Sequence, residues 1–224
     1  MYIYIFIAML IISYLVGSVS NARIISKLFK TDITKQGSGN PGTMNMLRTL
    51  GFKAGILTLI LDVLKSASMS LIAYFVFKNS GVIDGVVALY SCGLAVVIGH
   101  NFPIYYKFKG GKGVACILGI YAVAQPIWAL VVFVCCFVYL LIFDYGAIAS
   151  FIFITVLTVI EALQYRNLVT VEIIIAILFF LTIFMHRGNI NRMLTGTERK
   201  ANIMKHFKKL TKKEKKKYKI KEIG

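Results

Sequence analysis

Long runs of apolar residues dominate the chain and separate polar loops that are rich in lysine and arginine. Of the 224 residues, 58% are hydrophobic and 16% are charged, whereas a soluble domain rarely exceeds about half apolar residues. A membrane-spanning helix needs roughly 20 apolar residues. Runs of about this length lie near 2–22, 54–77, 82–98, 146–163 and 169–185, with a longer one at 114–143. The pattern predicts an all-α, polytopic membrane protein.

The long run at 114–143 decides how often the chain crosses the bilayer. Its thirty residues would make about 45 Å of helix, which is too long for one crossing and short for two. The positive-inside rule places the basic loops 23–53 and 99–113 in the cytoplasm, together with the basic C-terminal region. The run must therefore cross twice, or enter and leave as a re-entrant hairpin, with Gln125-Pro126 supplying the break. We predict seven transmembrane helices, the fourth and fifth short, with the N-terminus outside and the C-terminus cytoplasmic.

Positive charge is concentrated at the C-terminal end of the chain. Residues 186–224 hold fourteen Lys or Arg and three Glu, a net +11 of the total +17. Each lysine near an anionic leaflet contributes about 1 kcal/mol of binding. We therefore divide the chain into a transmembrane domain, 1–199, and a basic cytoplasmic tail, 200–224. We expect the tail to adsorb to the anionic cytoplasmic leaflet and not to nucleic acid.

The first polar cluster is a glycine loop that reads GSGNPGTMNMLR from Gly37 to Arg48. Three glycines within six residues allow positive φ and bring the backbone close to a ligand. Successive N–H groups in such a loop can form an anion-binding nest. Its side chains add neutral donors and a forked charge suited to phosphate, at Ser38, Asn40, Asn45 and Arg48. The alternative is a flexible linker between two hydrophobic segments.

Two further polar clusters follow the same chemistry. A Gly-Gly-Lys-Gly turn at 110–113 opens an apolar helix, so Lys112 sits at an anion-binding helix N-terminus. The turn lacks the Ser or Thr of a P-loop, so we infer no nucleotide hydrolysis. In the third cluster, His186, Asn189 and Arg192 recur at helical spacing and can share one face. The alternatives are lysines that signal topology and basic residues that anchor a helix end.

Acidic residues are few, and none forms an acid/base pair. Asp62 and Lys65 lie at i,i+3 and should pair, because acids within a membrane are usually paired. Glu161 and Glu172 lie near the outer ends of their helices, where exposure is the simple expectation, and Glu198 is expected to be an ion-pair partner. We find no Ser-His-Asp arrangement and no spacing typical of zinc ligands. The composition indicates a site for phosphates at a membrane face, with an amphiphilic ligand.

Together the three clusters resemble the motifs of the PlsY family, the bacterial integral-membrane acyl-phosphate:glycerol-3-phosphate acyltransferases. GSGNPGTMNMLR is similar to the family's G-S-G-N-x-G-A-T-N-x-x-R. GHNFPIYYKFKGGKGVA and HRGNINRMLTGTE resemble its second and third motifs, in the same order. The resemblance implies a seven-helix fold in the bacterial cytoplasmic membrane, with the active site facing the cytoplasm. It also implies that the enzyme needs no metal or other cofactor.

The activity implied by the resemblance is transfer of a fatty acyl group from acyl phosphate to the 1-hydroxyl of sn-glycerol 3-phosphate. The products would be lysophosphatidic acid and inorganic phosphate, in phospholipid biosynthesis. A soluble enzyme that supplies acyl phosphate would be a partner. The resemblance leaves the general base open among His186, His100 and the donor's own phosphate, and we slightly favour the substrate-assisted route.

The resemblance also implies a role for individual residues of the clusters. Residues of the glycine loop would hold acyl phosphate: Ser38, Gly39, Asn40 and Gly42. Four side chains would bind the phosphate of glycerol 3-phosphate: Arg48, Lys112, Ser150 and His186. Three would act in catalysis, orienting the acceptor or polarising the carbonyl: Asn101, His186 and Asn189. Four would support the site: Asn45, His100, Arg192 and Glu198.

The main departure from the family lies at 143–150, where Asp144 and Ala147 replace a usual basic residue and a usual serine. We expect these changes to weaken phosphate binding, and Asp144 to repel a dianion. A divergent paralogue with altered activity is therefore one alternative. A transporter or flippase for a phosphorylated metabolite or lipid is another, although transporters place their sites near the bilayer midplane.

Overall fold

The regular elements of the protein are all helices in a computed structural model that describes residues 1–203 and 205. The helices, in chain order, are α1 (Tyr2–Ser18), α2 (Asn21–Leu28), α3 (Thr43–Leu50), α4 (Phe52–Phe77), α5 (Gly85–Asn101), α6 (Val114–Ala124), α7 (Pro126–Phe143), α8 (Gly146–Gln164), α9 (Val169–Met185) and α10 (Arg187–Leu194). Two short 3-10 turns are η1 (Ile33–Lys35) and η2 (Ile104–Tyr106). The all-α prediction is confirmed. The basic tail expected at 200–224 lies mostly outside the described residues, so its adsorption stays a prediction.

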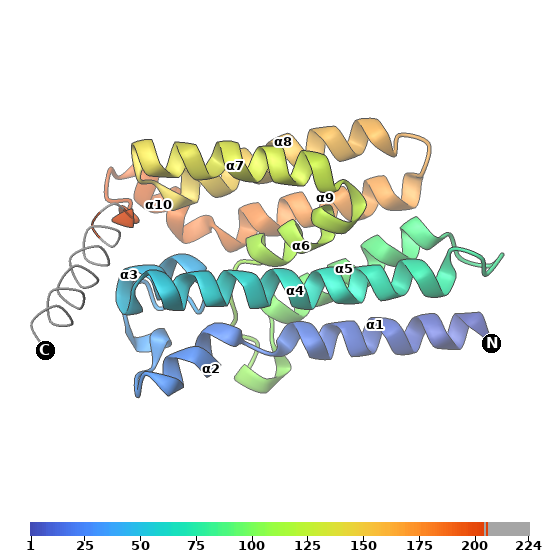
Figure 1. Cartoon of the computed structure of the whole chain (residues 1–224), viewed down its shortest axis with the longest axis horizontal. Helices are drawn as coiled ribbons and strands as arrows, with labels where there is room; N and C mark the ends of the chain where they lie inside the picture. The colour runs from blue at the N-terminus through green and yellow to red at the C-terminus, as the bar shows by residue number, and fades with distance from the viewer. Residues whose placement is uncertain (204, 206–224) are drawn as a thin grey trace, which may run out of the picture.

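The long helices lie side by side along one axis of the molecule (Figure 1). Helix α5 packs against α1 and α4, α4 packs against α6, and α8 packs against α7 and α9. The short helices α2, α3 and α10 gather at the end opposite the N-terminus (Figure 1). The glycine loop lies at this end beside α3, whereas the loop 99–113, with η2, lies midway along the bundle (Figure 1).

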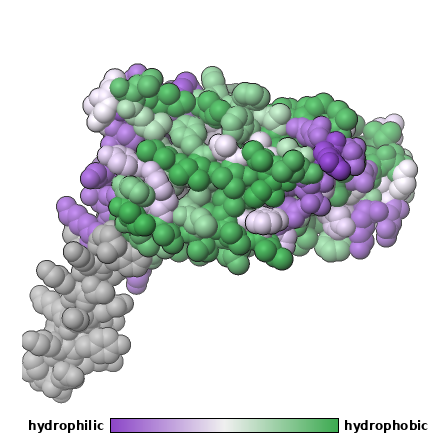
Figure 2. All heavy atoms as spheres, turned by 90° about the horizontal axis from the view of Figure 1, so that it is seen from above, coloured by the Kyte–Doolittle hydropathy of each residue, from purple (hydrophilic) through white to green (hydrophobic). Residues whose placement is uncertain are grey.

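The surface and the helix lengths are those of a multi-pass membrane protein. Hydrophobic residues cover the middle of the face shown in Figure 2, and hydrophilic residues gather towards its two ends. Within the described chain, five helices are long and apolar enough to cross a bilayer, or six if α9 and α10 form one span bent by 54°. Helix α6 has 11 residues, about 17 Å. The count of seven crossings and the orientation stay predictions.

One expectation about the spans is confirmed and two are corrected. The predicted break at Gln125-Pro126 is present, since Pro126 is the first residue of α7. Of the two helices on either side of the break, both expected to be short, only α6 is short, because α7 continues for 18 residues up to Phe143. The first long helix ends at Ser18 and not near residue 22, since the chain turns at Val19 and Ser20 before α2 begins.

The prediction that Glu161 is exposed is wrong. Glu161 is fully buried, and its carboxylate accepts a hydrogen bond from the hydroxyl of the buried Tyr90. Glu161 lies near the end of α8, but on the side of the helix that packs into the core with Phe153, Ile154 and Leu157. Its side of the helix, and not its position along the helix, therefore determines its exposure. Glu172 is partly exposed.

Candidate active site

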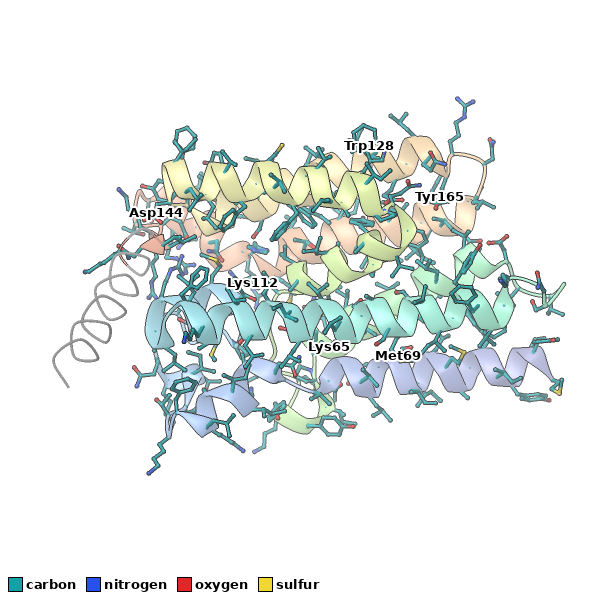
Figure 3. The ribbon with its side chains drawn as sticks, in the orientation of Figure 1. Lys65, Met69, Lys112, Trp128, Asp144 and Tyr165 are labelled. Carbon is teal, nitrogen blue, oxygen red and sulfur yellow. The ribbon has the colours of Figure 1, made fainter. Side chains whose placement is uncertain are left out.

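A cavity of about 200 Å³ brings the three polar clusters together. The side chains that line it come from the glycine loop, the turn before α6, α8 and α10. They include Ser38, Asn40, Asn45, Arg48, His100, Lys112, Ser150, His186, Asn189 and Arg192. Figure 3 shows Lys112 in the interior of the bundle beside α4, away from either end. Residues separated by up to 154 positions in the chain thus face one polar space.

The conformation of the glycine loop is fixed by Asn45, in the first turn of α3. Its amide nitrogen donates to the carbonyls of Ile33 and Gln36, at 3.2 and 3.0 Å. Its oxygen accepts from the N–H of Ser38 at 2.9 Å. Gly37 has φ +56, and a Cβ there would meet the Asn45 oxygen. Because Asn45 is 1% exposed, the loop is held from inside the protein, which fits the supporting role expected for this residue.

The turn before α6 carries Lys112, whose pKa is lowered by its surroundings. Lys112 donates a hydrogen bond to the side-chain oxygen of Asn189. Burial and then the positive charges of Arg192 and Arg48 lower the pKa of Lys112 to about 8, although Glu198 acts in the opposite direction. A bound phosphate would stabilise the charged form, because an opposite charge favours ionisation. An anion bound in the cavity would therefore raise the pKa of Lys112 towards its usual value.

Glu198 organises the third cluster. Its two oxygens accept from the amide nitrogen of Asn189 at 2.8 Å and from Nε of Arg192 at 3.0 Å. The Arg192–Glu198 ion pair expected from the sequence is therefore present. Together with Lys112, these residues form a continuous chain of charged and amide groups across the cavity.

His186 ends α9 and turns one ring nitrogen away from the solvent. Its Nδ1 lies 2.9 Å from the carbonyl oxygen of Thr182. A carbonyl can only accept, so Nδ1 carries the hydrogen in this arrangement, and Nε2 is left as an acceptor. His186 is 2% exposed and lines the cavity. The ring can therefore contact a ligand through Nε2.

Three expected site residues do not line the cavity. Glu198 lies behind it and contacts the lining residues Asn189 and Arg192. Asn101 is 1% exposed, and both polar atoms of its side chain are buried without a hydrogen-bond partner in the described structure. It lies behind Gly113, where an added Cβ would stand 2.9 Å from the Asn101 oxygen. Gly39 faces a separate hollow on the other side of the glycine loop. Their roles stay predictions from the resemblance.

His100 borders the cavity and belongs to a buried ionic cluster. The ammonium group of Lys65 lies 2.9 Å from Asp62 and 3.1 Å from Nδ1 of His100, so the predicted Asp62–Lys65 pair is confirmed. Asp62, His100 and Cys116 are close enough together to hold a metal ion. The Lys65 ammonium, however, already supplies the positive charge beside two of these three ligands. The donor set therefore does not fit a metal centre.

A segment after α10, residues 199–203, runs over the cavity end of the bundle and is called the strap. Arg48 donates to the carbonyls of Arg199 and Lys200, both at 2.9 Å. The Asp144 carboxylate accepts from the backbone N–H groups of Asn202 and Ile203, at 3.0 and 3.3 Å. Figure 3 shows Asp144 at this end of the molecule. Asp144 thus fastens the strap and does not line the cavity, whereas Ala147 does.

An apolar groove of about 180 Å³ adjoins the polar cavity. The groove runs between α4 and α7, with Ile56, Leu59 and Phe137 among its walls, and Ile203 of the strap also borders it. Six residues line both spaces: Thr43, Met44, Val114, Ala115, Gly146 and Ser150. The protein therefore offers a cationic cavity next to an apolar groove, an arrangement suited to an amphiphile with a phosphate group.

A family model described as "Glycerol-3-phosphate acyltransferase" matches residues 7–196. The chain belongs to this family. Among curated relatives, the glycerol-3-phosphate acyltransferase of Thermoanaerobacter pseudethanolicus is 37% identical over 191 residues, which are 85% of this chain and 92% of the relative. The glycerol-3-phosphate acyltransferase 2 of Bacillus anthracis is 38% identical over 192 residues, which are 85% of this chain and 96% of the relative.

Solved structures of PlsY, an integral membrane glycerol 3-phosphate acyltransferase, have the same fold. Its glycerol 3-phosphate form matches with a TM-score of 0.79 and 35% identity, over 87% of this chain and 94% of the PlsY chain. Its lysophosphatidic acid form matches with a TM-score of 0.76 and 36% identity, with the same coverage. The family resemblance inferred from the three motifs is therefore confirmed.

The depressed pKa of Lys112 predicts how anion binding by the acyltransferase cavity depends on pH. The ammonium is charged below pH 8 and loses its charge as the pH rises further, so affinity for inorganic phosphate should fall about tenfold between pH 7.5 and 9.5. Equilibrium binding in detergent would measure this. Lys112→Arg should flatten the profile, because a guanidinium stays charged. An equally flat profile in the unmodified protein would contradict the prediction.

Asp144→Asn tests the role of Asp144 in holding the strap. The amide offers one acceptor oxygen in place of two, so the backbone N–H groups of Asn202 and Ile203 should exchange hydrogen about tenfold faster. Hydrogen-exchange mass spectrometry would measure this. Asp32→Asn is the matched control, because Asp32 bonds only locally with Thr34. Unchanged exchange at 202–203 in Asp144→Asn would show that the carboxylate does not hold the strap.

Proposed function

We propose that the protein transfers a fatty acyl group from acyl phosphate to the 1-hydroxyl of sn-glycerol 3-phosphate, releasing lysophosphatidic acid and inorganic phosphate. The observation that carries the proposal is that the cationic cavity and the apolar groove adjoin and share six lining residues. An acyl phosphate needs a cationic site for its phosphate and an apolar site beside it for its acyl chain. The PlsY structures in glycerol 3-phosphate and lysophosphatidic acid forms support the same acceptor and product.

The proposed acceptor site is the set of cations around Lys112. Lys112 and Arg48 would bind the phosphate of glycerol 3-phosphate. His186 and Ser150 would accept from its hydroxyl groups, because Nε2 of His186 is an acceptor and the hydroxyl hydrogen of Ser150 is already donated. The strap engages two of the five N–H groups of Arg48, so three remain for an anion. Ser150 donates to the Gly146 carbonyl at 2.9 Å, and its oxygen can still accept from the acceptor's hydroxyl groups.

The proposed donor site is the glycine loop. Ser38, Asn40 and Gly42 line the cavity. Gly42 has no side chain, so the backbone there can come close to the phosphate of the donor. Gly39, with φ +73, would shape the loop and not touch the donor. The acyl chain would then leave through the shared residues Met44 and Ala115 into the groove, where burial of each CH₂ contributes about 0.8 kcal/mol.

The chemical step requires little covalent machinery, because acyl phosphate is an activated mixed anhydride. The acceptor's hydroxyl oxygen attacks the carbonyl carbon, a C–O ester bond forms, the bond from that carbon to the phosphate oxygen breaks, and phosphate leaves. The hydroxyl proton goes to the departing phosphate or to Nε2 of His186, and we favour the phosphate. Positioning can supply several kcal/mol of the barrier, and each oxyanion donor about 3 kcal/mol.

Asn189 is proposed to align the reacting groups. Its oxygen is bonded to Lys112 and one amide hydrogen to Glu198, which leaves one hydrogen for the substrate. Arg192 and Glu198 would hold this amide in place. Asn101 would need to reach the cavity past Gly113, so its catalytic role rests on the resemblance alone.

We place the reaction at the cytoplasmic face of a bacterial cell membrane. Helices α3 and α10, which line the cavity with Arg48 and Asn189, lie at the end of the bundle opposite the N-terminus, which the positive-inside rule assigns to the cytoplasm. Both the acceptor and a soluble enzyme supplying acyl phosphate would reach the cavity from that side. No metal or other cofactor enters the proposal.

A divergent paralogue that binds substrate without turnover is the second candidate. One observation favours it: Ala147 lines the cavity at a position where the family commonly has serine, so one hydroxyl that could bind phosphate is missing. Asp144 does not favour it, because its carboxylate is bonded to the strap.

Phosphate release from palmitoyl phosphate by the purified protein tests the proposal. Release should depend on glycerol 3-phosphate and should fall at least about 100-fold in Lys112→Ala, because a charged contact to the phosphate is lost. Lys78→Ala, at the far end of α4, is the matched control. Substrate binding without release would favour the paralogue, and neither binding nor release by folded protein would overturn the proposal.

A further inference from the structure

A second hollow, of about 510 Å³, lies on the outer side of the glycine loop. It shares none of its lining residues with the candidate active site. The loop forms the wall between the two spaces, because Ser38 and Asn40 line the cavity whereas Gly39 and Pro41 line the hollow. The far wall of the hollow is the segment around η2.

The hollow carries excess positive charge. Arg23, Lys107 and Lys109 line it, and none of its lining residues is acidic. The nearby carboxylate of Asp32 interacts electrostatically with Arg23, but one carboxylate offsets only part of the charge of three cations. Three cations gathered around a concave space attract an anion of more than one charge.

Arg23 is fixed in position and keeps a free donor. One terminal nitrogen donates to the carbonyl of Lys109 at 2.8 Å, and the guanidinium carbon lies 4.5 Å from the centre of the Tyr106 ring. The Nε–H of Arg23 is buried and has no hydrogen-bond partner in the described structure. Arg23 also lines the hollow. One of its terminal N–H groups is used by the Lys109 carbonyl, so the other terminal N–H groups are those a ligand oxygen in the hollow would contact.

The backbone that presents the two lysines is strained. Lys107 and Phe108 both have positive φ, +53 and +58, although neither is glycine. Residues held in this region are found at ligand clamps. Ile104, Tyr105 and Phe108 beside them are at least half exposed, and aromatic residues next to lysines are typical of the membrane interface.

We propose that this hollow is a second phosphate-binding site, separate from the active-site cavity. A guanidinium with two ammonium groups matches the several acceptor oxygens of a phosphate. The phosphate would belong to the headgroup of an anionic phospholipid or to a free phosphate monoester such as glycerol 3-phosphate. Because the glycine loop is the shared wall, an occupant would also order the loop that lines the cavity. The inference does not rest on the acyltransferase reaction, since binding is measured without turnover.

The test removes the two exposed lysines together, in Lys107→Gln/Lys109→Gln. One arm titrates the delipidated protein in detergent with phosphatidylglycerol and counts bound lipid by native mass spectrometry. The other arm titrates the protein in phosphatidylcholine nanodiscs with glycerol 3-phosphate and counts sites by calorimetry. Lys78→Gln/Arg166→Gln is the matched control, because it removes two cations from segments at the other end of the bundle.

We expect the double variant to lose at least about tenfold in affinity in one arm, relative to the control. A loss for phosphatidylglycerol identifies the lipid headgroup, and the disappearance of one of two glycerol 3-phosphate sites identifies the monoester. Arg23→Gln should give a similar loss in the same arm. Thermal unfolding checks that each variant is folded. Affinities within twofold of the control in both arms, for both variants, would overturn the proposal.

Discussion

The contact between Lys112 and Asn189 is the interaction on which the candidate site depends. It joins the turn before α6 to α10, which are 77 residues apart, and Glu198 extends it to Arg192. In a protein whose surface is mostly apolar, positive charges close together need either a counter-charge or an anionic ligand. Glu198 is the carboxylate that acts on both Lys112 and Arg48, whereas Asp62, which lines the cavity, is already paired with Lys65. The shortage of negative charge is what fits the site to phosphate.

Short elements produce this cavity within a bundle of long helices. Helix α6 begins at Val114, directly after Gly113, and runs for only 11 residues, so its N-terminus and Lys112 lie inside the bundle and not at its end (Figure 3). Helix α3 and the glycine loop close the space from the other side, held by Asn45. The strap then covers the end, fastened by Arg48 and Asp144. The apolar groove lies against the cavity and shares six lining residues with it.

Patterns that are local in sequence predicted the structure well. Hydrophobic run lengths gave the all-α membrane fold, Gln125-Pro126 gave the break, and i,i+3 spacing gave the Asp62–Lys65 pair. The motifs predicted which residues would meet in the cavity. The predictions that failed concern features that depend on long-range packing. The burial of Glu161 follows from the face that α8 turns inward, and the position of Asn101 follows from Gly113 packing in front of it. The strap joins residues 58 and 59 positions apart through backbone groups, for which side-chain patterns carry no signal.

The central claim is that one continuous space holds both the phosphate and the acyl chain of a single ligand. A structure of the protein with bound lysophosphatidic acid tests it most directly. The account predicts the phosphate within hydrogen-bond distance of Nζ of Lys112, and the acyl chain between α4 and α7 against Leu59 and Phe137. A phosphate in the cavity with its chain elsewhere, or a ligand that avoids Lys112, would contradict the account.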